Sequence, residues 1–319
     1  GGDGVMAKLG EVCTIVSGST PKTSVTSYWD GNIKWITPAE LNEDTFYIMD
    51  SIRHITEEGK EKTGLSYLPT GTVILSSRAP IGKTAIAGCE MCCNQGFKNL
   101  ICSDAIYNEY LYFFLKSKTD YLNSLGRGAT FKEISKSIVE SIEIPLPEVN
   151  QQKEIAEKFK KLEQLISLRK QQLAKLDELV KARFVEMFGE PSSNPMGWLQ
   201  TTVGAECYYI KDGPHKSLTD VGMENGYPFI SVRNIVNGYI DFSTAKYISE
   251  ADYKDAIKKC CPEKGDILYS KGGTTGIAKL VDIDIKFANW VHLAVLKFNH
   301  NEFNGSFFEK MLNCDYCYK

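Results

Sequence analysis

The sequence has no run of about 18 uncharged apolar residues and no basic, apolar leader, so it predicts neither a membrane-spanning helix nor a secretory signal peptide. Histidine is scarce, and the four residues form no pair at the i, i+4 spacing of helical metal ligands. The Gly-x-Ser-x-Gly elbow of serine hydrolases and the Asn-Pro-Pro-aromatic motif of amino-methylating enzymes are both missing. These absences favour an intracellular, soluble protein, which we expect in the cytoplasm.

The sequence also has no excess of positive charge: it contains 37 Lys and Arg residues and 40 Asp and Glu residues, so the net charge is −3. Such a chain has no overall field that would draw it onto nucleic acid, so any DNA binding must come from local clusters of residues. The 319 residues are 43% hydrophobic and 24% charged, which is typical of folded proteins and suffices for about two domains. We interpret residues 1–6 as a tag.

Ten cysteines are present, and without an export signal we expect them to be reduced thiols. Two C-x2-C steps, Cys89 with Cys92 and Cys314 with Cys317, could each supply half of a tetrahedral zinc site. Neither step has a compact second pair of ligands at the right spacing. The sequence therefore predicts no metal site.

Residues 150–188 contain no Gly or Pro and are rich in Lys, Glu, Gln and Leu, which favours one long helix. We predict a spacer helix over 150–189. Steps of four and three residues from Ile155 trace a coiled-coil seam that only Arg169 and Arg183 interrupt. One small domain cannot bury so long a seam, so we expect a partner helix; a rod that packs only on its own domains is the alternative. The candidate partner-binding residues are Phe159, Leu162, Ile166, Leu173, Leu176 and Val180.

The segments on either side of this helix repeat one another with a shift of 194 residues. The best block runs from Gly71 to Gly82 and matches Gly265 to Gly276; glycines that bracket a β-branched run predict a turn, a buried strand and a second turn. Further matches are Gly10 with Gly204, Cys13 with Cys207, Lys22 with Lys216, Trp35-Ile36-Thr37 with Phe229-Ile230-Ser231, and Phe113-Phe114 with Phe307-Phe308.

We therefore predict an α+β fold in which two similar domains of mixed strands and helices are joined by the long coiled-coil-type α-helix. The domains are placed at residues 7–149 and 190–319. With the same shift Lys319 falls on Leu125, so we expect the second domain to lack its C-terminal end and a second long helix.

Loops at equivalent places in the two copies combine hydroxyl, amide and cationic side chains, the groups that hold phosphates and read base edges. Ordinary polar loops of a soluble domain have a similar composition and remain the alternative. The candidate DNA-binding residues are Lys22, Thr37, Arg78 and Lys83 in the first copy and Lys216, Ser231, Arg233, Asn234 and Lys271 in the second.

One of these loops supports a competing hypothesis. It ends in Gly82-Lys83-Thr84, like a phosphate-binding loop, but it has Ser77 in place of the first glycine. The repeat has Ile277 where this loop has Lys83, so the loop does not need the lysine to keep its shape. A nucleotide-dependent enzyme is thus one alternative function, and a protein-binding scaffold that binds no DNA is another.

The border between the first copy and the helix carries the most specific motifs. They are Gly126-Arg127-Gly128-Ala129-Thr130, Ile134-Ser135-Lys136, Ile142-Glu143-Ile144-Pro145-Leu146-Pro147 and Gln151-Gln152-Lys153-Glu154-Ile155-Ala156. They resemble the end of a target recognition domain and the start of a conserved helix in the DNA specificity subunits of Type I restriction-modification systems. The resemblance extends over the whole chain apart from the tag and the missing C-terminal end.

This resemblance implies a non-catalytic subunit without a cofactor, whose two domains dock on double-stranded DNA and each read one half of a split target. It implies that the long helix is the spacer ruler and binds the modification (methyltransferase) subunits, and through them the motor/restriction subunit. Self-association through the same helix of another copy is a further expectation. The assembled complex, rather than this chain, would methylate adenine and cleave DNA.

Overall fold

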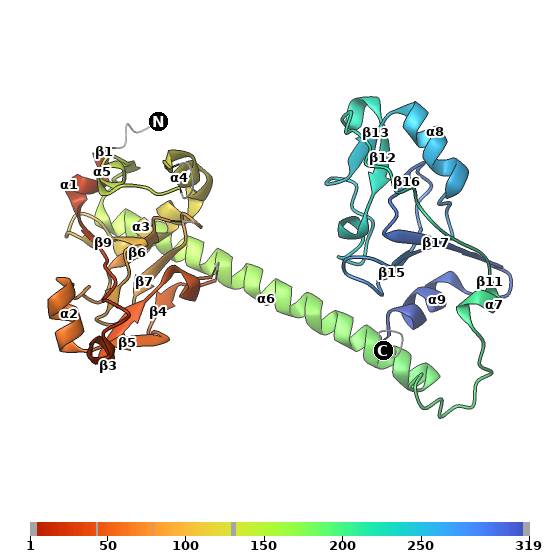
Figure 1. Cartoon of the computed structure of the whole chain (residues 1–319), viewed down its shortest axis with the longest axis horizontal. Helices are drawn as coiled ribbons and strands as arrows, with labels where there is room; N and C mark the ends of the chain where they lie inside the picture. Colours follow the sequence, from red (N-terminus) through yellow and green to blue (C-terminus); the bar gives the residue numbers. More distant parts are fainter. Residues whose placement is uncertain (1–4, 43, 79, 129–131, 315–319) are drawn as a thin grey trace. The chain divides into compact units, whose positions relative to one another are not determined.

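The computed structural model describes residues 5–42, 44–78, 80–128 and 132–314. The chain divides into two compact units, residues 1–169 and 170–319. The border between them lies within α6 (Val149–Phe188), the long helix labelled in Figure 1. In the described part of the chain, no helix is long and apolar enough to cross a membrane.

Unit 1 is built on two small sheets. Over the described residues, one sheet has the order β2-β9-β6-β7-β4 and the other the order β5-β3-β8, and β1 pairs separately with β10. The strands are β1 (Met6–Lys8), β2 (Cys13–Ser17), β3 (Trp29–Ile36), β4 (Tyr47–Ile48), β5 (Arg53–Ile55), β6 (Val73–Ser76), β7 (Thr84–Ala87), β8 (Cys92–Cys93), β9 (Phe97–Cys102) and β10 (Glu143–Pro145). The helices are α1 (Leu9–Val12), α2 (Glu57–Thr63), α3 (Asn108–Ser117), α4 (Thr119–Leu125) and α5 (Lys136–Glu140), with 3-10 turns η1 (Thr26–Tyr28) and η2 (Pro38–Glu40).

Unit 2 repeats most of this topology, without counterparts of β4 and of the β1–β10 pair among the described residues. Its sheets have the orders β11-β17-β14-β15 and β13-β12-β16 over the described residues, and β12 runs parallel to β16 as β3 runs parallel to β8. The strands are β11 (Cys207–Asp212), β12 (Tyr227–Ile230), β13 (Lys246–Ile248), β14 (Ile267–Ser270), β15 (Ala278–Leu280), β16 (Ala288–Asn289) and β17 (Leu293–Phe298). The helices are α7 (Val203–Glu206), α8 (Glu250–Lys259) and α9 (Gly305–Leu312), with 3-10 turns η3 (Met223–Asn225) and η4 (Val232–Asn234). The predicted fold class, two similar α+β domains and a long helix, is confirmed.

Glycines at matching places make the shared turns. Gly71 and Gly82 flank β6 with φ values of 89° and 96°, and Gly265 and Gly276 flank β14 with 99° and 84°. Residues with a Cβ rarely adopt such backbone angles, so glycine allows the chain to turn sharply at both ends of the strand. All four side chains of β6 are buried between these turns. The predicted sequence of turn, buried strand and turn is therefore confirmed.

One predicted match between the copies is wrong in register. The shift of 194 residues places Phe113 on Phe307, but α3 and α9 begin 197 residues apart, at Asn108 and Gly305. The segment between β15 and β16 is longer than that between β7 and β8, so a match without gaps fails beyond it. The buried helix positions that do correspond are Leu111 with Phe308 and Leu115 with Leu312.

The first turns of α6 are fastened to unit 1 through Gln152, which is fully buried. Its side-chain amide donates to the carbonyls of Ala105 at 3.0 Å and Pro147 at 2.8 Å, and its side-chain oxygen accepts from the backbone N–H of Tyr107 at 2.8 Å. A buried amide with three partners loses little by leaving water. This residue therefore fixes the start of the long helix on its domain.

Two ion pairs continue this attachment along α6. The Lys160 ammonium lies 2.9 Å from the carboxylate of Glu109, and Glu163 lies 2.7 Å from Lys116. Burial opposes ionisation of Glu109, but hydrogen bonds from Tyr47 and Lys160 hold the pKa of this carboxyl below its usual value. The helix is thus bound to unit 1 over about three turns.

Candidate nucleic-acid interface

Loops from four parts of unit 1 are hydrogen-bonded into what we call the first loop cluster. It comprises residues 18–22, 37–41, 77–78 with 80–83, and 94–96. The hydroxyl of Thr20 donates to the side chain of Gln95. The backbone N–H of Ser77 donates to the carbonyl of Gly96 at 2.7 Å, and Ser77 in turn accepts from Ile134 at 2.9 Å. Segments distant in sequence thus form one polar surface next to β6 and β9.

Lys83 lies in this cluster, but its ammonium group is hydrogen-bonded to other residues of the same cluster. The ammonium group donates to the carbonyl of Leu41 at 2.6 Å and to that of Pro38 at 3.4 Å. These carbonyls belong to the loop that η2 starts, so the lysine clamps that loop onto the turn before β7. The structure therefore supports a positioning role for Lys83 in preference to direct contact with DNA.

Thr37 is similarly occupied at the start of η2. Its backbone N–H and its hydroxyl both donate to the same carboxylate oxygen of Glu40, at 2.7 and 3.0 Å. The other carboxylate oxygen of Glu40 accepts from the backbone N–H of Ile52 at 2.8 Å. This capping box fixes the shape of the loop and leaves Thr37 half-buried.

Arg78 and Lys22 are the exposed cations of the first loop cluster that the sequence predicts. Arg78 pairs with Glu133 at 3.0 Å, and Lys98 binds the other oxygen of that carboxylate at 3.3 Å. Burial opposes ionisation of Glu133, but the hydrogen bonds from both cations hold its pKa below the usual value. Lys22 holds the loop through its carbonyl, which accepts from the indole N–H of Trp29 at 3.2 Å, while its side chain is exposed.

A second loop cluster occupies the equivalent places in unit 2. It comprises residues 212–216, 231–234, 271–276 and 290–292. The ammonium group of Lys271 forms a short ion pair with Asp212, and Lys259 approaches the other oxygen of that carboxylate at 3.3 Å. The hydrogen bond from Lys271 is the main reason that the pKa of Asp212 is lowered to about 2. Lys271 is also tied through its backbone N–H to the carbonyl of His292 at 2.9 Å.

Of the three predicted residues at η4, Arg233 is exposed, whereas Ser231 and Asn234 hold the loop through hydrogen bonds. Asn234 is buried; its side-chain oxygen accepts from the N–H of Ser231 at 2.9 Å and from its hydroxyl at 3.2 Å. The amide of Asn234 donates to the carbonyl of Asp241 at 3.0 Å. Arg233 is exposed and donates to the carbonyl of Thr244 at 2.9 Å. Ser231 and Asn234 therefore hold the loop that presents Arg233.

Lys216, the counterpart of Lys22, is exposed at the edge of the second loop cluster. Its ammonium group lies 3.2 Å from the carboxylate of Asp255 in α8. An exposed pair of this kind adds little to stability, so a phosphate can compete for the lysine at little cost.

The sequence analysis did not single out Gln95 or His292. Gln95 lies in the turn that precedes β9, and His292 lies in the turn that precedes β17. Each turn is hydrogen-bonded to a neighbouring loop of its cluster. Gln95 is exposed, and an amide is suited to reading adenine. A turn signal at Asn94-Gln95-Gly96 was available, but the shift of 194 residues does not align it with the equivalent turn of unit 2.

The structure does not support the nucleotide-binding alternative. Thr84 opens the strand β7, whereas a phosphate-binding loop leads into a helix whose N-terminus faces the phosphates. The lysine of the motif is held by backbone carbonyls, as described above. Among the described residues, no group of three or more His, Cys, Asp or Glu side chains is placed to hold a metal ion. Cys317, half of one C-x2-C step, lies outside the described residues.

The six candidate partner-binding residues on α6 are all exposed. Their side chains range from Phe159 and Val180, each 47% exposed, to Leu173, which is 64% exposed. Phe159 stacks on Phe113 of unit 1, with ring centroids 5.4 Å apart. Exposed apolar residues at seam spacing along so many turns are typical of a helix that packs on a partner.

Comparison with known proteins gives a family match over most of the chain. A family described as the Type I restriction modification DNA specificity domain matches residues 3–178 and 210–317. The Type I restriction enzyme MjaIX specificity subunit of Methanocaldococcus jannaschii is 34% identical over 310 residues, which cover 91% of this chain and 71% of that protein. The putative MjaX specificity subunit of the same organism is 31% identical over 110 residues, or 34% of this chain and 26% of that one.

Solved structures give a more distant match. The crystal structure of a Type-I restriction-modification system S subunit from M. genitalium shares 16% identity, with a TM-score of 0.46. The match covers 97% of this chain and 76% of that one.

Proposed function

Because this chain belongs to the family of Type I restriction modification DNA specificity domains, we propose that it is the non-catalytic, sequence-specific DNA-binding subunit of a Type I restriction-modification complex. The observation that carries the proposal is the repeat: two units of one topology each gather polar and cationic loops into a cluster beside the same strands. Two such modules in one chain suit a target in two halves. Residues 7–149 and 190–319 are the proposed target recognition domains, and residues 150–189 the spacer between them.

The candidate residues take two roles in this proposal. The exposed cations contact phosphates, which set the register of the protein on DNA, or base edges, which specify sequence; they are Lys22, Arg78, Lys216, Arg233 and Lys271. The residues whose polar groups are occupied hold the loops in shape, and they are Thr37, Lys83, Ser231 and Asn234.

The exposed seam of α6 is the proposed docking site for the modification subunits and, through them, for the motor/restriction subunit. Its apolar residues favour a helical partner, since each leucine-sized side chain gains roughly 1.5–3 kcal/mol when it is fully buried. Pairing of the seam with another copy of this chain is the competing arrangement. Double-stranded DNA as the target implies the cytoplasm as the site of action.

The proposal is tested by sequencing the methylated sites in a genome that carries this chain with its modification subunits. We expect a motif of two specific halves separated by unspecified bases. Methylation at unrelated sites, or no new methylation at all in the presence of the intact complex, would contradict it.

Arg78→Ala then tests the first loop cluster. We expect binding to the half-site read by unit 1 to weaken by about 1–3 kcal/mol if the guanidinium pairs with a base edge. Electrophoretic shifts with DNA altered in either half measure the effect, and Lys62→Ala, an exposed lysine of α2 outside the cluster, is the matched control. An equal loss on every sequence assigns Arg78 to a phosphate, and no loss removes it from the interface.

A further inference from the structure

Two cysteines of unit 1 face each other across the main sheet. In the register of β2 and β9, Cys13 lies opposite Cys102, as Ile15 lies opposite Leu100. Residues directly opposite each other project from the same face of a sheet, and both cysteines pack in the core cluster that contains Ile15 and Leu100. Cys13 is only 7% exposed, whereas Cys102 is half-buried. The two thiols therefore lie together at the edge of the main core of unit 1.

The hydrogen-bond pattern gives this pair the closer of the two spacings that occur in antiparallel strands. The backbone N–H of Ser103 donates to the carbonyl of Val12 at 3.0 Å, and these residues form the next pair in the same register. Hydrogen-bonded and non-hydrogen-bonded pairs alternate, so Cys13 and Cys102 form a non-hydrogen-bonded pair. In such pairs the Cα atoms lie about 4.5 Å apart, within the range of about 4.4–6.8 Å that a disulfide spans. A bond between the two sulfurs therefore needs little movement of the backbone.

The two thiols differ in how easily an external reagent can reach them. The hydrogen bond with Cys102 and, after it, burial raise the pKa of the Cys13 thiol above its usual value. A buried thiol with a raised pKa reacts slowly with an oxidant from solution. Because Cys102 is more exposed, it is the thiol at which such a reagent enters.

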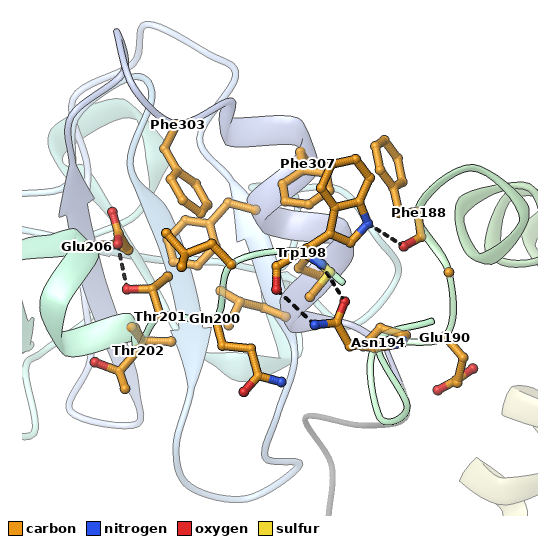
Figure 2. A pocket seen from close by; sticks show the side chains of 17 residues that line it. Phe188, Glu190, Asn194, Trp198, Gln200, Thr201, Thr202, Glu206, Phe303 and Phe307 are labelled. Atoms are coloured by element: carbon orange, nitrogen blue, oxygen red, sulfur yellow. Dashed lines mark hydrogen bonds between the residues drawn. The ribbon is translucent and has the colours of Figure 1, made fainter. Parts of the chain in front are cut away.

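Unit 2 contains one half of this arrangement. Cys207 opens β11 directly after α7, as Cys13 opens β2 directly after α1. Figure 2 shows Glu206, the residue before Cys207, among the side chains that line a pocket of this unit. The residue opposite Cys207 is Phe298, so its thiol has no cysteine across the sheet. Cys207 is therefore a control for Cys13 within the same chain.

We propose that Cys13 and Cys102 form a modification site, at which a small disulfide such as oxidised glutathione converts the two thiols into a reversible covalent bond between β2 and β9. The Cys102 thiolate attacks one sulfur of the oxidant, whose own disulfide breaks and releases one thiol. The Cys13 thiol then loses its proton and attacks the Cys102 sulfur, which releases the second thiol. The two cysteines lose two electrons in all, and the oxidant is reduced to two thiols. An excess of reduced thiol reverses both steps.

The bond acts on the part of unit 1 that carries the first loop cluster. β2 leads into residues 18–22 of this cluster, and β9 follows residues 94–96. About 90 residues lie between the two cysteines, and closing so long a loop restricts the unfolded chain. We expect the bond to raise Tm by roughly 5–15 °C. The inference depends on strand register and not on DNA binding, so it and the proposed function fail independently.

The experiment equilibrates the full chain with oxidised and reduced glutathione, blocks the remaining thiols and digests the chain with trypsin without reductant. Trypsin releases Cys13 in residues 9–22 and Cys102 in residues 99–116, each without a second cysteine. We expect mass spectrometry to find these two peptides cross-linked after oxidation and separate after treatment with dithiothreitol. The peptide of residues 184–211, which contains Cys207, is expected to remain free of cross-links.

Thermal unfolding followed by circular dichroism supplies a second readout. We expect oxidation to raise Tm in the unchanged chain and in Cys207→Ser, but not in Cys102→Ser. Cys13→Ala keeps an apolar side chain in the core and is expected to behave like Cys102→Ser. Separate Cys13 and Cys102 peptides after oxidation, equal cross-linking of Cys207, or a rise in Tm that persists in Cys102→Ser overturns the proposal.

Discussion

The ammonium group of Lys83 and the side-chain amide of Asn234 are both bound within their own unit, although each lies in a loop of suitable composition for DNA. Their neighbours Arg78 and Arg233 also have partners, Glu133 and the carbonyl of Thr244, but both side chains remain exposed to solvent. Desolvating a bound polar group and breaking its hydrogen bonds costs free energy that a DNA contact must first offset. At the scale of single residues, the exposed arginines are therefore better placed to contact DNA than the lysine and the asparagine that hold their loops.

Asp212 gives the second loop cluster a predictable dependence on pH. Its pKa is lowered from 3.8 to about 2, mainly by the hydrogen bond from Lys271. Because the pKa is lower in the folded than in the unfolded state, the ionised carboxylate stabilises the fold above about pH 4, and this contribution is lost as the pH falls through about 2. We expect Asp212→Asn to lower Tm at pH 6 and the difference from the unchanged chain to vanish near pH 2.

Thermal unfolding followed by circular dichroism between pH 6 and pH 2 measures this difference. Asp104→Asn, at an exposed position of unit 1, serves as the control and is expected to change Tm little at either pH. A difference for Asp212→Asn that stays constant over the whole range would show that the ion pair does not stabilise the fold.

At the scale of elements, one buried amide fixes the start of α6 on unit 1, ahead of the two ion pairs. Gln152→Leu keeps a side chain of similar size but leaves the N–H of Tyr107 and the carbonyls of Ala105 and Pro147 without their partner. We expect a loss of about 1–3 kcal/mol in the free energy of unfolding, measured by urea denaturation. Gln151→Leu, one residue earlier and exposed, is expected to stay within about 0.5 kcal/mol. Equal effects of the two substitutions would contradict the anchoring role.

The elements differ in how far the sequence could predict them. The long helix and the glycine-bracketed strand are local patterns, and both lie where they were predicted, at α6 and β6. The equivalence of α3 and α9 depends on a longer connection before β16, which a comparison without gaps cannot detect. The role of Lys83 depends on carbonyls 42 and 45 residues away in the chain. Only the folded chain brings such groups together. The spacing of residues in the sequence therefore identified the loop, but it could not show that Lys83 binds backbone carbonyls.

The seam of α6 provides a second prediction at this scale. Leu173→Glu combined with Leu176→Glu places two charges on the exposed apolar seam, and we expect it to abolish co-purification with the modification subunits. Gln171→Glu with Ala174→Glu adds the same charge on the opposite side of the helix and is expected to leave the complex intact. A complex that survives both double substitutions would exclude the seam as the docking site.

At the scale of the whole molecule, the net charge of −3 means that the field far from the protein does not attract DNA. Affinity must then come from the few cations that the two loop clusters expose. Three of these cations are already paired with carboxylates, namely Arg78 with Glu133, Lys216 with Asp255 and Lys271 with Asp212, and these pairs must exchange a carboxylate for a phosphate. Electrostatic binding of this kind is local and limited in extent.

The salt dependence of binding measures how many phosphates the protein neutralises. Each phosphate neutralised contributes about −0.9 to the slope of log K against log salt concentration, so the five exposed cations, Lys22, Arg78, Lys216, Arg233 and Lys271, predict a slope of roughly −4.5. Affinity for the specific target is then expected to fall several hundredfold between about 50 and 200 mM salt, as measured by fluorescence titration. Removing one of the five by substitution with Ala should make the slope shallower by about 1 if that residue contacts a phosphate, whereas Lys83→Met should leave the slope unchanged. A slope near −9 would mean that a much broader basic surface contacts DNA than the two loop clusters expose.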